Sequence, residues 1–145
     1  MKIFVQIASY RDPQLIHTIK NMIENAKRPK NLRFGIARQY NPEDKFDDLS
    51  EYDKDKRFRI IDIPHQESKG VCWVRNLIQD LYQDEDYYLQ LDSHHRFVEH
   101  WDTKLIDMLN FLRGVGYYKP ILSAYLPSYF PDKDPDSRTQ EVWML

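Results

Sequence analysis

Hydrophobic and polar positions alternate along the chain in a pattern that predicts strands and helices in turn. Short apolar runs at residues 3–8, 32–37, 58–63 and 87–91 each lead into polar residues. Such runs are typical of buried strands that end in loops. A further run at residues 121–126 predicts a fifth strand.

Apolar residues at helical spacing separate these runs and predict three helices. The stripes cover residues 15–26, 71–81 and 101–112. Residues 41–57 carry seven acidic side chains and predict a solvated loop with a helical turn. The alternation of strands and helices predicts an α/β fold with a largely parallel sheet, and the length predicts one domain over residues 1–145.

Composition and charge narrow the class of protein. The 145 residues are 41% hydrophobic and 30% charged, which is typical of a globular domain. The net charge of −2 argues against nucleic acid as a partner, and no run approaches the roughly 20 apolar residues that span a membrane. The first residues lack a signal-peptide pattern, so we expect a cytoplasmic location. The single cysteine, Cys72, lies near the apolar side of its helix, which predicts a buried thiol.

Polar segments follow three of the predicted strands, at residues 9–13, 64–70 and 92–96. Parallel sheets bind ligands outside the carboxyl ends of their strands. We therefore expect a binding site at this edge of the sheet. Within it, Tyr10 and Arg11 could stack on a nucleotide base or hydrogen-bond to it, and they could equally close the edge of the core.

Asp92 and His94 are two residues apart at the end of a predicted strand. In an extended chain such residues point to the same side, so a carboxylate and an imidazole can converge on one cation. Imidazole moves the preference from Mg²⁺ toward Mn²⁺, and two ligands leave room for a substrate diphosphate. His95 is the competing ligand, expected on the opposite face. The alternative is a turn whose polar residues are only hydrogen-bonded.

Ser68-Lys69-Gly70 opens the second predicted helix, and Arg75 lies in its first turns. A helix N-terminus offers free N–H groups and a partial positive charge, both of which favour a phosphate. The alternative is that Ser68 or Gly70 caps the helix and that the cations are solvated.

Two segments of the chain resemble a known family. They are SKGVCWVRNLIQDLYQDEDYYLQLDSHHRFVEHWD at residues 68–102 and IASYRD at residues 7–12. They resemble the GlcNAc-transferase family of GT-A glycosyltransferases, which includes cytoplasmic polypeptide N-acetylglucosaminyltransferases that act on hydroxyproline. The resemblance extends over residues 3–129 and implies a GT-A type, Rossmann-like, mostly parallel sheet flanked by helices. Because GT-A domains are usually longer, we expect this chain to be the N-terminal part of one, truncated at its C-terminus.

The resemblance also implies roles for individual residues. Asp92-Ser93-His94 matches the family's variant of the Asp-x-Asp motif, with Asp92 and His94 on the metal. The loop over residues 9–12 would hold the uridine, and Arg75 would lie near the ribose or diphosphate. The implied donor-binding residues are Ala8, Ser9, Tyr10, Arg11, Asp12, Ser68, Lys69, Gly70, Arg75, Asp92 and Ser93. The resemblance implies no catalytic residue.

The implied activity is metal-dependent transfer of GlcNAc from UDP-GlcNAc to a polypeptide hydroxyl with retention of configuration. Mn²⁺ is expected over Mg²⁺, the acceptor is a polypeptide or a glycan, and neither nucleic acid nor a membrane is expected as a partner. Two alternatives remain open. One is a non-catalytic or incomplete nucleotide-sugar-binding domain. The other is a different α/β enzyme, a nucleotidyltransferase, that uses the same metal and diphosphate chemistry.

Overall fold

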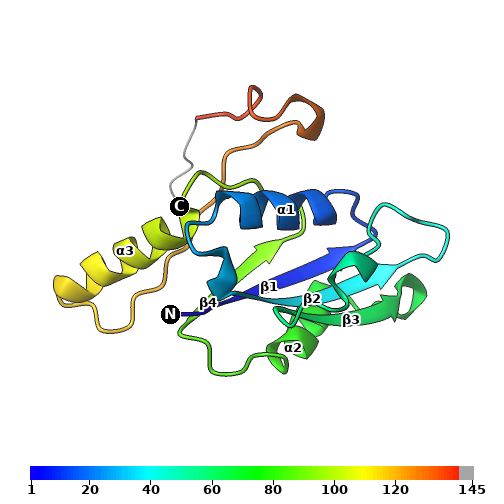
Figure 1. The fold of residues 1–145 in the computed structure, drawn as a ribbon, viewed down its shortest axis with the longest axis horizontal. Coiled ribbons are helices and arrows are strands. Elements are labelled where there is room, and N and C mark those ends of the chain that lie inside the picture. Colours follow the sequence, from blue (N-terminus) through cyan, green and yellow to red (C-terminus); the bar gives the residue numbers. More distant parts are fainter. Residues whose placement is uncertain (141–145) are drawn as a thin grey trace. The chain divides into compact units, whose positions relative to one another are not determined.

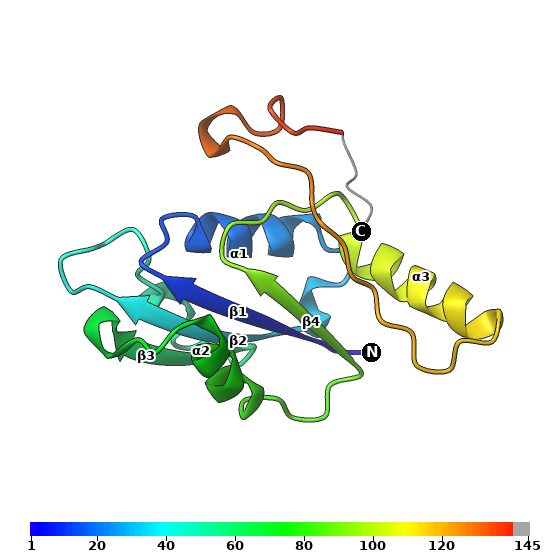
Figure 2. The same ribbon diagram turned by 180° about the vertical axis from the view of Figure 1, so that it is seen from behind.

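The computed structural model describes residues 1–140, and the chain separates into two compact units (Figures 1 and 2). The first unit is Met1–Thr103, and the second begins at Lys104. The first contains four strands and two complete helices, and a third helix, α3, begins at its end. In chain order these elements are β1 (Ile3–Tyr10), α1 (Leu15–Asn25), β2 (Leu32–Tyr40), β3 (Phe58–Pro64), α2 (Val71–Gln79), β4 (Tyr87–Asp92) and α3 (Trp101–Gly114).

The four strands form one sheet in the order β3-β2-β1-β4, and every neighbouring pair is parallel. The register places Val5 of β1 between Phe34 of β2 and Leu89 of β4. The prediction of an α/β fold with a parallel sheet flanked by helices is therefore confirmed.

The helices α1 and α2 cover opposite faces of this sheet (Figures 1 and 2). Because side chains alternate along a strand, Val5 and Ile7 face α1, whereas Phe4 faces α2. On the α2 face, one core cluster joins the strands to the helix; its buried members are Phe4, Ala37, Ile63, Val74 and Ile78. These contacts fix α2 against β1 and β2, and they thereby fix the N-terminus of the helix at the carboxyl edge of the sheet.

Glycine at position 35 allows this close approach. A Cβ atom at Gly35 would lie 2.3 Å from Cζ of Phe4 and 2.9 Å from Cγ2 of Ile78, both closer than carbon atoms pack. Any larger residue at Gly35 therefore has to displace the Phe4 ring, the α2 helix, or both.

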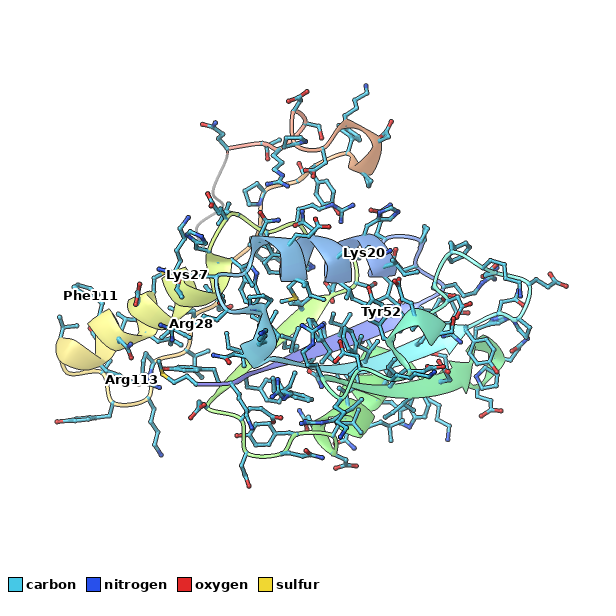
Figure 3. All side chains as sticks on the ribbon, viewed as in Figure 1. Lys20, Lys27, Arg28, Tyr52, Phe111 and Arg113 are labelled. Atoms are coloured by element: carbon cyan, nitrogen blue, oxygen red, sulfur yellow. The ribbon has the colours of Figure 1, made fainter. Side chains whose placement is uncertain are left out.

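The loop between β2 and β3 forms as expected, with a short 3₁₀ turn at Ser50–Tyr52, but it is not fully solvated. Leu49 and Asp47 are buried, and the Tyr52 ring (Figure 3) stacks on Phe58 with 4.2 Å between ring centroids. Burial raises the pKa of the Asp47 carboxyl, although Arg38 opposes the shift. The loop therefore packs against the sheet instead of extending into solvent.

Two further predictions are wrong. Residues 121–126 form no strand in the described part of the chain, and Ile121 is 89% exposed. An apolar run becomes a strand only where another strand pairs with it, and no strand within residues 1–140 pairs with this run. Cys72 is exposed instead of buried. It lies two positions, about 200° around the helix, from the buried Val74.

The second unit continues α3 and then runs through irregular chain. A short 3₁₀ turn at Pro131–Lys133 is followed by an ion pair in which Nε of Arg138 lies 2.5 Å from Oδ1 of Asp134. Several large apolar side chains of this unit are exposed, among them Phe111 on α3 (Figure 3). Within residues 1–140, no helix is both long and apolar enough to cross a membrane.

Candidate functional site

The strand order reverses at β1. The chain passes from β1 to β2 and β3 on one side of it and then returns to β4 on the other side (Figures 1 and 2). Open α/β sheets bind ligands in the crevice outside the carboxyl ends of the strands at such a reversal. Here the reversal lies between the segments that follow Tyr10 and Asp92, two of the three polar segments singled out in the sequence.

Asp12 joins these two segments. Its Oδ2 accepts a hydrogen bond from Oγ of Ser93 at 2.5 Å and lies 2.9 Å from Nδ1 of His94. Its Oδ1 accepts the backbone N–H of Gln14 at 2.8 Å, at the start of α1. Arg11, at φ 46°, turns the chain between β1 and Asp12. The carboxylate thus connects the first loop, the α1 N-terminus and the turn after β4.

The turn after β4 is fixed from α1 as well. Oγ1 of Thr18 donates to the carbonyl of Ser93 at 2.7 Å and accepts the N–H of His95 at 3.0 Å. Strand β4 ends at Asp92, so the extended geometry assumed in the sequence argument stops there. The rings of His94 and His95 are nearly parallel, with 6.0 Å between their centroids. The expectation that His95 points to the opposite face assumed that the extended geometry persists, and this condition is not met.

Arg75 on α2 reaches Asp92 across the edge of the sheet. Its Nη2 donates to Oδ1 of Asp92 at 2.8 Å, and the Asp92 side chain is 52% exposed. Nε2 of Gln6 donates to the carbonyl of Arg75 at 2.6 Å, which ties this part of the helix to β1. The guanidinium therefore stands beside the predicted metal ligand.

The N-terminus of α2 borders a small pocket. Gly70 precedes the helix at φ 93°, a conformation that favours glycine, and its N–H lies 3.4 Å from Oγ of Ser68. The pocket has a volume of about 210 Å³. Its lining comes from β1, β2 and the start of α2: Ala8, Tyr10, Gln39, Ser68, Gly70, Val71 and Val74.

The predicted site residues thus divide into two groups. Ala8, Tyr10, Ser68 and Gly70 line the pocket. The others form two hydrogen-bonded sets near the reversal of strand order: Asp12 with Ser93 and His94, and Arg75 with Asp92.

Three predicted residues lie outside both groups. Ser9 is buried on the α1 face, Nε of Arg11 pairs with Asp44 at 2.7 Å, and Nζ of Lys69 lies over the Trp73 ring at 5.6 Å. These arrangements give no support to a direct contact between a donor and Ser9, Arg11 or Lys69.

Hydrogen bonding sets the charge of Asp12. Burial opposes its ionisation, but the hydrogen bonds from Ser93, His94 and the Gln14 N–H outweigh burial and hold the pKa of Asp12 below its ordinary value. Burial lowers the pKa of His95, which favours its neutral form. A carboxylate anion at position 12 therefore faces the imidazole of His94.

Sequence reasoning missed two polar residues. Gln39 lines the pocket, yet the predicted strand ended at residue 37; extending the same alternation by two residues would have placed Gln39 on that face. Asp102, in the first turn of α3, is the second of these residues. Its buried carboxylate in fact accepts the N–H groups of Lys27 and Arg28 (Figure 3) at 2.8 and 2.9 Å. No local sequence signal marks that long-range contact.

Comparison with known families identifies the chain. The model of the family described as Glycosyltransferase (GlcNAc) matches residues 2–54 and 45–145. The chain belongs to this glycosyltransferase family. No curated protein matches its sequence. The family resemblance on which the sequence argument relied is therefore confirmed.

Solved structures of S. aureus TarS share the fold. Its crystal structure for residues 1–349 in complex with UDP-GlcNAc has a TM-score of 0.59 and 13% identity over 79% of this chain. A second TarS structure of residues 1–349 has a TM-score of 0.58 and 11% identity over 86% of the chain. The chain spans 32% and 39% of the two TarS chains. Both structures support the Rossmann-like fold of the family.

Proposed function

We propose that this chain supplies the donor site of a metal-dependent glycosyltransferase that uses UDP-GlcNAc. The observation that carries the proposal is the presence of two side-chain pairs, Arg75–Asp92 and Asp12–His94, where the strand order reverses. Family membership supports a glycosyltransferase. The TarS fold, whose crystal structure contains UDP-GlcNAc, supports that nucleotide sugar as the donor.

The residues at the end of β4 suit a divalent metal that a substrate helps to hold. The side chains of Asp92 and His94 are 52% and 60% exposed, so an oxygen and a nitrogen donor are accessible. Among residues 1–140, no group of three or more His, Cys, Asp or Glu side chains is placed to hold a metal ion. Two protein ligands leave room in the coordination shell for donor phosphate oxygens and water. The imidazole favours Mn²⁺ over Mg²⁺.

The bound metal would neutralise the charge that develops on the departing UDP. Arg75 would donate hydrogen bonds to the same diphosphate. Asp12 would orient the His94 ring through Nδ1, as carboxylates commonly orient metal-binding histidines. The pocket beside the α2 N-terminus would accept another part of the donor.

The Arg75–Asp92 ion pair predicts opposite effects on metal and donor binding. In the free chain Arg75 competes with a cation for Asp92, so Arg75→Met should strengthen binding of Mn²⁺ alone. The gain should be at most about fivefold, since an exposed ion pair contributes roughly 1 kcal/mol or less. The same variant should weaken binding of UDP-GlcNAc in the presence of Mn²⁺, because it removes a diphosphate ligand. Calorimetric titration measures both, and parallel changes in the two affinities would contradict this arrangement.

A polypeptide hydroxyl as acceptor and retention of configuration complete the proposal, and both rest on the family resemblance. The test is incubation of the chain with UDP-GlcNAc, Mn²⁺ and hydroxyproline-containing or serine-containing peptides. Mass spectrometry would detect a GlcNAc adduct, and the anomeric proton coupling in NMR would show an α-linked product if configuration is retained. A β-linked product would exclude retention, and transfer only to glycans would exclude the polypeptide acceptor.

The two alternative functions give different results with the same reagents. A nucleotidyltransferase would bind nucleoside triphosphates more tightly than UDP-GlcNAc. A non-catalytic domain would bind the donor without transfer and without releasing UDP by hydrolysis. Release of UDP by the purified chain would exclude a purely binding role.

A further inference from the structure

Gln6 is a fully buried amide in the middle of an interior strand. It is 0% exposed, as are its neighbours Val5 and Ile7 in β1. The register places it between Gly35 of β2 and Gln90 of β4. A polar side chain at such a position costs free energy unless hydrogen bonds replace those that it makes with water. An apolar side chain would fill the same space without that cost, so the amide needs a reason beyond packing.

The hydrogen bonds of Gln6 do not supply a reason within the fold. Its Nε2 donates to the carbonyl of Arg75 at 2.6 Å, but a carbonyl within α2 is already paired along the helix. Its Oε1 is buried and has no hydrogen-bond partner among residues 1–140. Turning the amide over would place Oε1 against the Arg75 carbonyl oxygen, which fixes the orientation of the amide. A buried acceptor is therefore left unpaired.

Arg75 carries an unpaired group of the opposite kind. Its Nη2 donates to Oδ1 of Asp92, whereas its Nε is buried and has no hydrogen-bond partner in the same part of the chain. The partner of the guanidinium, Asp92, is 52% exposed, but the backbone of Arg75 is held by a buried residue. A free buried acceptor on Gln6 and a free buried donor on Arg75 thus belong to two residues that are already hydrogen-bonded.

We infer that Gln6 is a positioning residue that holds Arg75 for the diphosphate of the donor. It fixes the backbone of Arg75 at the edge of the sheet, and its Oε1 accepts Nε of Arg75 when Asp92 turns to the metal. A metal on Asp92 takes up the charge that holds the guanidinium in the free chain. The outer N–H groups of Arg75 then donate to the diphosphate, while Nε donates to Gln6. This inference rests on the proposed function, because the diphosphate is taken to be that of UDP-GlcNAc.

The first test is the variant Gln6→Met, which keeps the approximate size of the side chain and removes the amide. Its affinity for UDP-GlcNAc with Mn²⁺ should fall by about threefold to tenfold, as expected for the loss of a hydrogen bond. Its melting temperature should be unchanged or raised, because a buried amide with an unpaired oxygen is removed. A residue that only ties α2 to β1 would instead lower the melting temperature. Gln79→Met, at the exposed end of α2, is the matched control and should change neither quantity.

Two further titrations show whether Gln6 acts through Arg75. With Mn²⁺ present, Gln6→Met should weaken binding of inorganic diphosphate by the same factor as binding of UDP-GlcNAc. Binding of Mn²⁺ alone should not weaken, because Arg75 competes with the metal for Asp92 and does not support it. In the Arg75→Met background, adding Gln6→Met should change donor affinity by less than about twofold, since no guanidinium is left to position.

The outcomes separate the role of Gln6 from the proposed function. Three results would each overturn the role of Gln6 alone. They are donor affinity retained in Gln6→Met, an undiminished loss in the Arg75→Met background, and a melting temperature lowered by more than about 5 °C, which would mark a structural role. If the unaltered chain bound neither UDP-GlcNAc nor inorganic diphosphate with Mn²⁺, the proposed function would fall with it.

Discussion

Replacing Asp92 by alanine is expected to abolish the Mn²⁺-dependent part of UDP-GlcNAc binding, with affinity lowered by about 100-fold or more. Asp92 is the only carboxylate of the Asp92-Ser93-His94 motif, and its side chain is 52% exposed at the end of β4. Without it His94 would be left as a single protein ligand, and the guanidinium of Arg75 would lose its carboxylate partner. Titration calorimetry with and without Mn²⁺ measures the effect.

The control for this variant is Asp80→Ala. Asp80 follows α2 at its C-terminal end, and its side chain is exposed, so its loss should leave donor affinity unchanged. The melting temperature of each variant shows whether the fold survives. A folded Asp92→Ala variant that binds UDP-GlcNAc as tightly with Mn²⁺ as the unaltered chain does would exclude Asp92 as a metal ligand.

Arg59→Met is expected to lower the free energy of unfolding by about 3–5 kcal/mol, because it leaves a buried carboxylate without its cation. The Glu85 side chain is 2% exposed, and its Oε1 lies 2.6 Å from Nη2 of Arg59. Arg59 also donates to the carbonyl of Leu81 at 2.6 Å and lies over the Phe4 ring. At roughly 2–4 °C per kcal/mol, the melting temperature should fall by about 6–20 °C.

The double variant Arg59→Met, Glu85→Gln should recover much of this loss, since it removes both charges together. Lys20→Met is the control for an exposed pair. Nζ of Lys20 (Figure 3) lies 3.2 Å from Oε1 of Glu51, and both side chains are about half exposed. The free energy of unfolding should therefore fall by roughly 0.5 kcal/mol or less. If Arg59→Met and Lys20→Met lowered the free energy of unfolding equally, burial would not strengthen the Arg59–Glu85 pair.

The contribution of Glu85 also depends on pH. Burial alone would raise its pKa, but Arg59 and the Gln83 N–H outweigh burial and hold the pKa of Glu85 below its ordinary value. The stabilisation is therefore complete above the unfolded-state pKa of about 4.3 and is lost as pH falls through the lower folded-state value. The stability difference between the unaltered chain and Glu85→Gln should shrink below pH ~4 in denaturant titrations. A difference that stays constant there would contradict the lowered pKa.

The elements that the sequence predicted correctly are those that local pattern determines. Short apolar runs predicted β1 through β4 and helical spacing predicted all three helices, because burial of a strand or of one helix face leaves such a pattern within a few residues. The run at residues 121–126 shows the limit of that reasoning. It has the composition of a strand, but strand formation depends on a pairing partner elsewhere in the chain.

The candidate site shows the same contrast between features that local sequence determines and features that depend on distant parts of the chain. Its place at the carboxyl edge of the sheet could be predicted, because polar residues after successive strands meet there in any parallel sheet. The contact between Asp12 and His94 could not, since 82 residues separate the two and only the strand order brings them together. Gln39 was missed for a local reason: β2 extends to Tyr40, three residues past the predicted end.

The most direct test of the central claim is calorimetric titration of UDP-GlcNAc into the chain, with Mn²⁺ and again with EDTA. We predict binding with Mn²⁺ and at least a tenfold loss of affinity with EDTA, because donor diphosphate and protein share the metal in this account. Inorganic diphosphate should compete with the donor for the same site. Equal affinity in Mn²⁺ and EDTA, or no binding in either, would contradict a metal-dependent donor site at the ends of β1 and β4.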